Sequence, residues 1–219
     1  MTGFDQSQKE FWSGNTNLRP YDHPIVEAFA RQRVSFIRGL LDANIGSCLE
    51  VGCGDGFGMY YMRSLGKVFG CDISRPMLDH NPLRQSVSEA DIYHLPHPDG
   101  CFDLVYCWEV LHHVADVPRA IAEMARVSRK YILVFEPNSF NPPMAVFGLV
   151  GPSEIGLLRF TPWYLRSQFR RAGLKDFTTM TVGTFTPNRT PMWLYKILAS
   201  LPYRMPVIGI SNMALGRVK

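Results

Sequence analysis

The sequence predicts an α/β fold in which a doubly wound parallel sheet carries helices on both faces. Short apolar runs alternate with helix-forming segments from residue 47 to residue 136, and this alternation is typical of parallel strands joined by crossover helices. The run Cys101–Trp108 is apolar almost throughout, as strands buried on both faces are. The chain has 219 residues and no visible internal repeat, so its length suits one such domain.

The first two segments are expected to be a helical lid, residues 1–44, and a core, residues 45–136. His23-Pro24 opens an amphipathic helix that runs to about Leu41, because apolar residues recur near one face. Ser74 is a typical helix N-cap, and Asp116 precedes a proline that falls in the first turn of the next helix. In the core we expect helices at 57–65, 74–78 and 117–127, and strands at 47–51, 67–71, 84–88, 101–108 and 131–136.

The third segment, residues 137–219, departs from this alternation. Residues 138–158 are apolar and contain Pro142-Pro143, which suits a loop or cap over a substrate. Thr161-Pro162 restarts a helix that ends near Gly173, a residue type common directly after helices. We expect strands at 174–181 and 208–218, with a Pro- and Trp-bearing insertion at 187–206.

The most informative motif lies at the end of the first predicted strand. The strand reaches Glu50 and runs into glycines at alternate positions from Gly52 to Gly58. Because glycine has no Cβ, such a turn lets the backbone approach a ligand closely. The second strand ends at Cys71-Asp72, where a carboxylate is well placed to hold two ribose hydroxyls. Together these features predict a cofactor that contains a nucleoside.

The glycine spacing discriminates between such cofactors. The dinucleotide fingerprint G-x-G-x-x-G, begun at Gly52, requires a third glycine at position 57, which is Phe57. No Gly-Lys-Ser/Thr is present to form a Walker loop. The pattern E-x-G-x-G-x-G resembles that of the class I S-adenosylmethionine-dependent methyltransferases, and most of all their small-molecule branch with the ubiquinone/menaquinone-biosynthesis C-methyltransferases. Glu50 suits the ammonium group of S-adenosylmethionine, whereas it would repel a phosphate.

This resemblance implies the architecture of the whole chain. It predicts a Rossmann-like sheet of seven strands in the order 3-2-1-4-5-7-6, with the last strand antiparallel and strands 6 and 7 forming a hairpin. Residues 45–136 would be the cofactor-binding core, and residues 137–219 a substrate cap with the C-terminal hairpin. The resemblance is closest over residues 45–175.

The resemblance also implies a set of cofactor-binding residues, all outside the carboxyl ends of the strands. Asp72 matches the family's ribose-binding acid, and Asp91 matches the acid that accepts from the adenine amine. The alternative interpretations are a cap or turn residue for Asp72, a solvated loop residue for Asp91, and simple core side chains for Ile73 and Met77. The residues expected at the cofactor are Glu50, Gly52, Cys53, Gly54, Gly56, Asp72, Ile73, Met77, Asp91, Ile92 and Cys107.

The residues after the fourth strand are the catalytic candidates, because in the family this stretch borders the methyl group and the substrate. Methyl transfer from a sulfonium needs mainly alignment and desolvation, and a base is required only for a hydroxyl or an acidic carbon. We expect Glu109 and His112 to face either the pocket or solvent and to be the candidate bases, with His113 a weaker one. A structural hydrogen-bonding role is the alternative for His112. Neither pair has the spacing of a zinc site, so no metal is expected.

The charge of the chain is distributed unevenly. Residues 159–219 hold ten Lys/Arg and one acid, a net charge of +9, whereas the preceding residues carry −5. The apolar run from Met192 to Leu198 lies among Arg189, Lys196 and Arg204, and rings flanked by basic residues suit an anionic membrane surface. A dimer interface, a self-packed cap or a solvated basic face are the alternatives. Nucleic acid is a poorer partner, because bulky aliphatic residues surround the cations.

These observations favour a methyltransferase that acts on a small hydrophobic or lipid-linked acceptor by in-line displacement. Two other functions stay open: a non-catalytic S-adenosylmethionine-binding scaffold subunit, and a nicotinamide-dependent oxidoreductase. Five cysteines without a C-x-x-C pair indicate a reducing compartment, and Met1-Thr-Gly-Phe-Asp lacks the features of a signal peptide. We therefore expect a cytoplasmic protein, peripheral to the inner face of the membrane.

Overall fold

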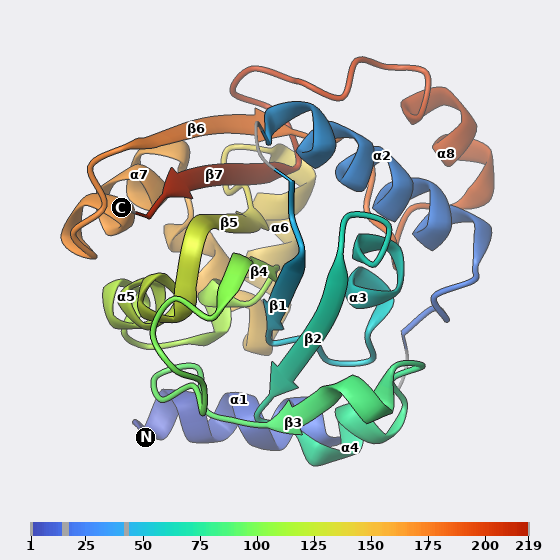
Figure 1. Ribbon diagram of the computed structural model, residues 1–219. Coiled ribbons are helices and arrows are strands. Elements are labelled where there is room, and N and C mark those ends of the chain that lie inside the picture. The colour runs from blue at the N-terminus through green and yellow to red at the C-terminus, as the bar shows by residue number, and fades with distance from the viewer. Residues whose placement is uncertain (1, 15–17, 42–43, 219) are drawn as a thin grey trace.

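A computed structural model describes residues 2–14, 18–41 and 44–218. Its centre is one seven-stranded sheet with the order β3-β2-β1-β4-β5-β7-β6 (Figure 1). β7 pairs antiparallel with β5 and with β6, and the other neighbouring strands pair in parallel. The sheet order and the antiparallel last strand are therefore confirmed. The strands are β1 Ser47–Val51, β2 Lys67–Asp72, β3 Val87–Glu89, β4 Phe102–Trp108, β5 Ser128–Pro137, β6 Phe177–Val182 and β7 Ser211–Arg217.

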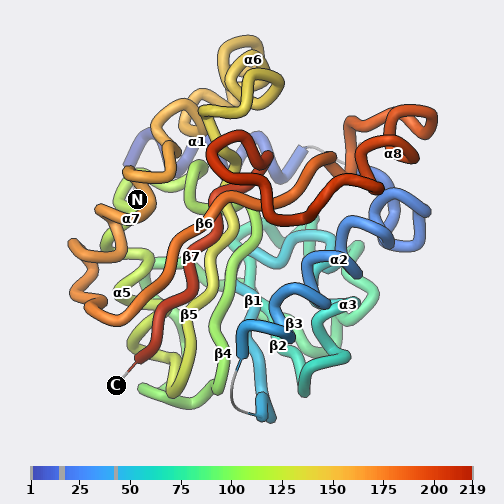
Figure 2. The backbone as a smooth tube through the Cα atoms, turned by 90° about the horizontal axis from the view of Figure 1, so that it is seen from above, coloured from blue at the N-terminus to red at the C-terminus, as the bar shows by residue number. Residues whose placement is uncertain are grey.

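Helices cover both faces of this sheet and form two separate cores (Figure 2). On one face, α5 (Val117–Val127) and α7 (Pro162–Arg171) bury their apolar sides against β4 and β5. On the other face, α2 (Pro24–Leu40) and α3 (Phe57–Met62) do the same. Because both faces are covered, the central strands are apolar without alternation. The remaining helices are α1 Gly3–Gly14, α4 Arg75–Asp79, α6 Pro142–Val150 and α8 Met192–Leu198, and the 3-10 turns are η1 Arg84–Ser86, η2 Leu111–His113 and η3 Pro152–Arg159.

The helix starts follow from local hydrogen bonds that the sequence specifies. The side chains of Ser74, Asp116 and Thr161 each accept a bond from the backbone N–H three residues later. In each helix a proline stands in the first turn, where its missing N–H costs nothing. These caps confirm the predicted starts of α4, α5 and α7.

The edge strands differ from the predicted boundaries. Strand 3, expected at 84–88, begins at Val87, because the backbone of 84–86 closes a 3-10 turn on Asn81 and Leu83. The strand expected at 174–181 begins at Phe177, since the N–H of Leu174 bonds back to the carbonyl of Phe169 and closes α7. The strand expected at 208–218 begins at Ser211, after a turn closed by the bond from Gly209 N–H to the carbonyl of Met205.

The segment predicted as an apolar cap is helical. Residues 138–158 contain α6 and most of η3, and Asn141 caps α6 by accepting from the N–H of Met144. In the part of the chain that the structure describes, no helix is long and apolar enough to cross a bilayer.

Candidate functional site

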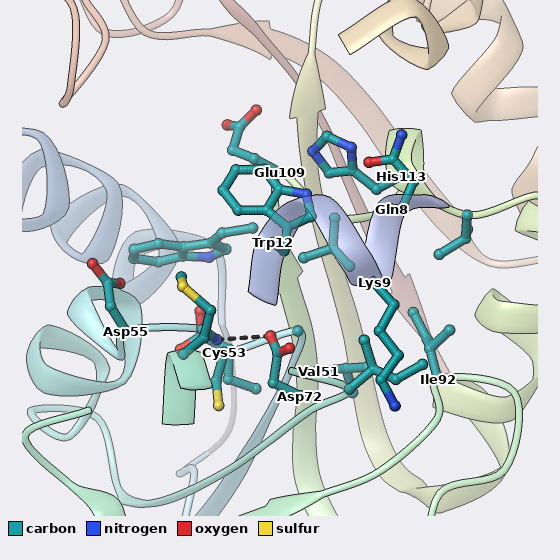
Figure 3. A pocket seen from close by; sticks show the side chains of 18 of the residues that line it. Gln8, Lys9, Trp12, Val51, Cys53, Asp55, Asp72, Ile92, Glu109 and His113 are labelled. Atoms are coloured by element: carbon teal, nitrogen blue, oxygen red, sulfur yellow. Dashed lines mark hydrogen bonds between the residues drawn. The ribbon is translucent and has the colours of Figure 1, made fainter. Parts of the chain in front are cut away.

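A cavity of about 240 Å³ lies at the carboxyl ends of the parallel strands, under helix α1 (Figure 3). This is the place where ligands bind in open α/β sheets. Asp5, Gln8, Lys9 and Trp12 of α1 all line it. Ten of the thirteen predicted site residues also line it, and they are Glu50, Gly52, Cys53, Gly54, Asp72, Ile73, Met77, Asp91, Ile92 and Glu109.

The glycine turn forms one wall of this cavity. Gly52 has φ +72°, and a Cβ built on it would lie 2.6 Å from a methyl carbon of Val110. Both the backbone conformation and the close approach therefore require glycine here. Gly56 also has a positive φ, of +80°, but it precedes α3, lies against Asn81 and does not line the cavity. Its positive φ lets the chain turn into α3, and its expected contact with the cofactor stays a prediction.

Asp72 is fixed at the end of β2 by two backbone hydrogen bonds. The N–H of Gly54 donates to Oδ2 at 2.9 Å, and the N–H of Ser74 donates to Oδ1 at 2.8 Å. Burial raises the pKa of the Asp72 carboxyl, and these bonds oppose the rise only in part. The carboxylate therefore has a set orientation toward the cavity, and no lysine or arginine of the described residues forms an ion pair with it (Figure 3).

Glu50 lies deeper, within β1, and is only 3% exposed. The hydroxyl of Tyr106 donates to its Oε2 at 2.9 Å. Burial raises the pKa of Glu50 to about 8, because the hydrogen bond from Tyr106 recovers only part of the lost hydration. A cation that enters the cavity would favour the ionised form of this carboxyl group.

The charges around the cavity are strongly asymmetric. Among the described residues that line it, Lys9 is the single lysine or arginine, whereas six are acidic: Asp5, Glu50, Asp55, Asp72, Asp91 and Glu109. Burial raises the pKa of Asp55 as well. Such a cavity favours a ligand that carries positive charge and hydroxyl groups, and it disfavours a phosphate.

Glu109 stands directly after β4 with φ +60°, an unusual conformation for a residue with a side chain. Its Oε1 accepts from Nη2 of Arg33 at 2.9 Å and from the hydroxyl of Ser211 at 3.1 Å. The guanidinium of Arg33 is 1% exposed and lies over the rings of Phe29, Trp108 and Phe135. The buried arginine therefore orients a carboxylate at the cavity wall, and the prediction that Glu109 faces the pocket or solvent is confirmed.

His112 faces neither the pocket nor solvent, which corrects that expectation. Its ring is 2% exposed, with Nδ1 2.7 Å from Glu136 Oε2 and Nε2 3.2 Å from Glu154 Oε2. Burial lowers the pKa of His112, but the two carboxylates outweigh it and raise the pKa to about 9. The adjacent His113 is the histidine that lines the cavity.

His112, His113 and Glu154 lie close enough together to be candidate metal ligands. Within the described ranges, ligand atoms of His112, His113 and Glu154 lie within 4.8 Å of one another. Both ring nitrogens of His112 already face carboxylate oxygens, and Glu136 also accepts from the N–H groups of Val110, Leu111 and His112. His112, Glu136 and Glu154 thus form a hydrogen-bond network that holds η2 against β5 and η3, whereas Nδ1 of His113 has no hydrogen-bond partner among the described residues.

Strand alternation explains which residues of β4 reach the cavity. Cys107 was expected beside the cofactor, but it is fully buried in the core beneath α5 and does not line the cavity. Trp108 points to the opposite face and lines the cavity, with its ring centroid 5.8 Å from that of Phe57. The alternation of side chains along a strand could have predicted Trp108 at the cavity. Arg33 could have been noticed as a charged residue on the apolar side of α2.

Comparison with known proteins adds independent findings. A family model described as a methyltransferase domain matches residues 49–132. The 27-O-demethylrifamycin SV methyltransferase of Amycolatopsis mediterranei is 26% identical over 206 residues, which cover 84% of this chain and 74% of the relative. The demethylmenaquinone methyltransferase of Thermus thermophilus is 36% identical over 114 residues, 47% of this chain and 50% of the relative.

Solved structures share the fold over the full length. An S-adenosylmethionine-dependent methyltransferase from Thermotoga maritima matches with a TM-score of 0.68 and 18% identity, covering 99% of this chain and 98% of that one. Geranyl diphosphate C-methyltransferase from Streptomyces coelicolor matches with a TM-score of 0.64 and 14% identity, covering 100% and 98%. At these identities the likeness shows a common architecture.

Proposed function

We propose that this chain is a class I S-adenosylmethionine-dependent methyltransferase, which the methyltransferase-domain match and the similar methyltransferases support, and that it moves a methyl group to a small hydrophobic or lipid-linked acceptor in the cavity under α1. The observation that carries this proposal is the set of six acidic side chains against one lysine among the described residues around the cavity. S-adenosylmethionine carries a sulfonium and an ammonium group, so its charge complements this lining.

The adenosine end of the cofactor is assigned to the carboxyl ends of β2 and β3. Asp72, already oriented by two backbone bonds, would hold the ribose hydroxyls. Oδ1 of Asp91 accepts a hydrogen bond from the N–H of Tyr93 at 2.9 Å. Oδ2 of Asp91 would then accept from the adenine amine, with the amide of Ile92 beside it. Ile73 and Met77 would pack against the adenine ring.

The methionine end is assigned to the glycine turn. Glu50, whose pKa is raised to about 8 by burial, would become ionised opposite the ammonium group, and Asp55, whose pKa burial also raises, would lie beside it. Gly52, Cys53 and Gly54 would lie along the chain of the amino acid. The sulfonium supplies an activated methyl group, and the residues described here would align it and exclude water.

The catalytic end of the cavity is assigned to Glu109. Its carboxylate is held by Arg33 and Ser211 and lines the cavity near His113 (Figure 3). For an acceptor with a hydroxyl or an acidic carbon, Glu109 would accept the proton. His112, which does not line the cavity, would contribute as a positioning residue by holding η2 in place.

The acceptor is assigned to the apolar part of the lining. Leu18, Val110, Val114 and Pro187 line the cavity together with the rings of Trp108 and Phe57. Relatives named for a rifamycin and for demethylmenaquinone support an acceptor of this character. A hydrophobic acceptor also fits peripheral contact with an anionic membrane on the cytoplasmic side, and a homodimer is the other partner consistent with an apolar surface.

The test is transfer of a labelled methyl group from S-adenosylmethionine into an extract of the host cell, followed by mass spectrometry of the lipid and aqueous fractions. We expect a labelled product in the lipid fraction, made by the wild type and lost in Glu109→Gln. Label confined to the aqueous fraction would overturn the hydrophobic acceptor. Cofactor binding without any labelled product would favour a scaffold subunit.

A further inference from the structure

The exposed hydrophobic side chains of this protein are concentrated in one part of the chain. Of the thirteen large apolar residues that are exposed in the described ranges, twelve lie between Phe140 and Ile208, and Phe11 is the other. Single exposed apolar residues are normal, but a gathering of this size marks an interaction surface.

Eight of these twelve residues lie on α6, on α8 or in the turn Val207–Ile208, and we call the outer sides of these three segments the cap surface. Val146, Leu149 and Val150 recur at helical spacing on α6, and Trp193 and Ile197 do so on α8. The inner sides of both helices meet in one hydrophobic cluster, to which Met144, Phe147, Tyr195 and Leu198 contribute. Figure 2 shows α6 and α8 at the same end of the molecule as α1.

The charge of this surface has one sign. Residues 137–210 contain two acids. Glu154 is buried against His112, and Asp176 lies by the start of β6 near Arg217. Arg189, Lys196 and Arg204 are exposed within or beside α8, and the Arg189 guanidinium lies 3.9 Å from the centre of the Phe147 ring. The cap surface therefore combines exposed apolar side chains with basic residues, and its three segments contain no acidic residue.

An anionic bilayer fits this combination better than a second copy of the chain. In a two-fold dimer the same patch meets itself, and the cations of the two copies would face each other without an acid to pair them. In a bilayer, the exposed apolar side chains would enter the acyl region, while the charged ends of Lys and Arg would stay among the anionic head groups of the lipid.

The cap surface is connected directly to the proposed acceptor site. Pro187 and Asn188 line the cavity and are followed by α8. Nη1 of Arg19 donates to the carbonyls of Pro187 and Thr190 at 2.8 and 2.9 Å, which ties this loop to the segment that covers the cavity. A bilayer on the cap surface would thus lie next to residues of the cavity wall.

We infer that the cap surface docks on anionic lipid and that the acceptor passes from the bilayer into the cavity beside residues 187–190. This inference rests on the proposed function for its second half. The docking itself is independent of catalysis, so the two can fail separately.

The experiment is sedimentation of the full chain with vesicles of phosphatidylcholine, alone or with an equal amount of phosphatidylglycerol, at low and high salt. We expect binding to the mixed vesicles that weakens with salt. The double variant Trp193→Ser/Ile197→Ser should reduce this binding about tenfold or more, because both side chains are solvent-exposed crests. Phe11→Ser is the matched control and should bind as the wild type does.

A second pair of variants tests the charge. Lys196→Gln and Arg171→Gln remove the same charge, but Arg171 lies at the end of α7. Lys196→Gln should weaken binding to the mixed vesicles more than Arg171→Gln does. S-adenosylmethionine affinity, measured in parallel, should be the same in all variants and reports whether the proposed function stands.

Three results would overturn the docking. Wild type that stays in solution with the mixed vesicles at low salt is one. Equal binding to both kinds of vesicle is another, because it removes the role of charge. The third is a wild-type dimer, seen by analytical ultracentrifugation, that Trp193→Ser/Ile197→Ser converts to monomer, because the second copy would then be the occupant.

Discussion

At the scale of single residues, the site depends on carboxylates of one chemical kind in different surroundings. Asp72 accepts two backbone hydrogen bonds and keeps a fixed orientation. Glu50 has one donor, the hydroxyl of Tyr106, and its pKa rises to about 8 through burial. We therefore expect Asp72 to recognise neutral hydroxyls and Glu50 to respond to positive charge.

The first prediction concerns Asp72. Replacement by Ala should weaken S-adenosylmethionine binding by about 1–3 kcal/mol, because charge-assisted hydrogen bonds to the ribose would be lost. Equilibrium dialysis with labelled cofactor measures this change. Asp79→Ala is the control, since Asp79 is exposed on α4 and pairs with Arg75. Equal affinity in Asp72→Ala and the wild type would refute the ribose assignment.

The second prediction concerns the proton on Glu50. At pH 7 the empty site holds this carboxyl largely protonated, because its pKa is raised to about 8. Binding of an ammonium group favours the carboxylate, so cofactor binding should release a proton. Calorimetry at pH 7 in two buffers of different ionisation enthalpy detects that release. It should disappear in Glu50→Gln, and binding heats independent of buffer in the wild type would contradict the assignment.

At the scale of elements, His112 joins three segments. It links η2 to Glu136 of β5 and to Glu154 of η3 through both ring nitrogens. Removing one partner of a buried charge pair leaves the others uncompensated. The network therefore stabilises the loop after β4, on which Glu109 and His113 stand.

The third prediction follows from this network. His112→Ala should lower the free energy of unfolding by about 3–5 kcal/mol, whereas His80→Ala, on the surface, should have little effect. Denaturant unfolding measures both. A His112→Ala protein as stable as the wild type but inactive would instead point to direct participation of His112 in the chemistry.

The fourth prediction gives the pH dependence of the same network. The pKa of His112 is raised from 6.5 to about 9 in the folded protein. The contribution of the His112 ion pairs to the free energy of unfolding is then complete below pH 6.5 and is lost as the pH rises through about 9. Denaturant unfolding at pH 6.5 and pH 9 should show this loss in the wild type and a smaller one in His112→Gln. Equal losses in both proteins would contradict it.

The elements were predictable where a local signal exists. Helix caps such as Ser74 and Asp116 and the glycines of the turn specify their conformation within a few residues, and the sheet order followed from the family resemblance. The strand that begins at Phe177 was misplaced because backbone bonds that close α7 compete with the edge of the sheet. The helix α6 has no polar face, so periodicity could not distinguish it from an apolar loop.

The site was predictable in part for the same reason. Residues fixed by the turn and the strand ends, such as Asp72, could be placed from sequence. Arg33 is 76 positions from Glu109 along the chain, and nothing local reports a contact of that range. Cys107 and Trp108 are neighbours whose assignment depends on which face of β4 looks toward the cavity, and this is a tertiary property.

At the scale of the whole molecule, a ligand bound in the cavity should raise the stability of the folded protein. A ligand that binds only the folded state stabilises it by about 2.7 kcal/mol at a hundred times its dissociation constant. For a domain of this size, that corresponds to a rise of roughly 5–10 °C in melting temperature. The fifth prediction is a shift of this order with S-adenosylmethionine, smaller in Asp72→Ala at the same concentration. Scanning calorimetry checks it, and equal shifts in both proteins would place the ligand elsewhere.

The chain is also divided by charge, with an acidic cavity and a basic C-terminal part. The cavity wall draws on residues from Asp5 to Asn188, so its assembly requires most of the fold. The cap surface lies in the basic part. This division lets one molecule attract a cationic cofactor and an anionic surface at different places.

The central claim is that the acidic cavity at the glycine turn binds a positively charged methyl donor. Isothermal titration of the full chain with S-adenosylmethionine, and separately with NADH, tests it most directly. We expect one S-adenosylmethionine to bind per chain, in competition with S-adenosylhomocysteine, and no heat from NADH. Binding of NADH without binding of S-adenosylmethionine, or of neither, would contradict the account.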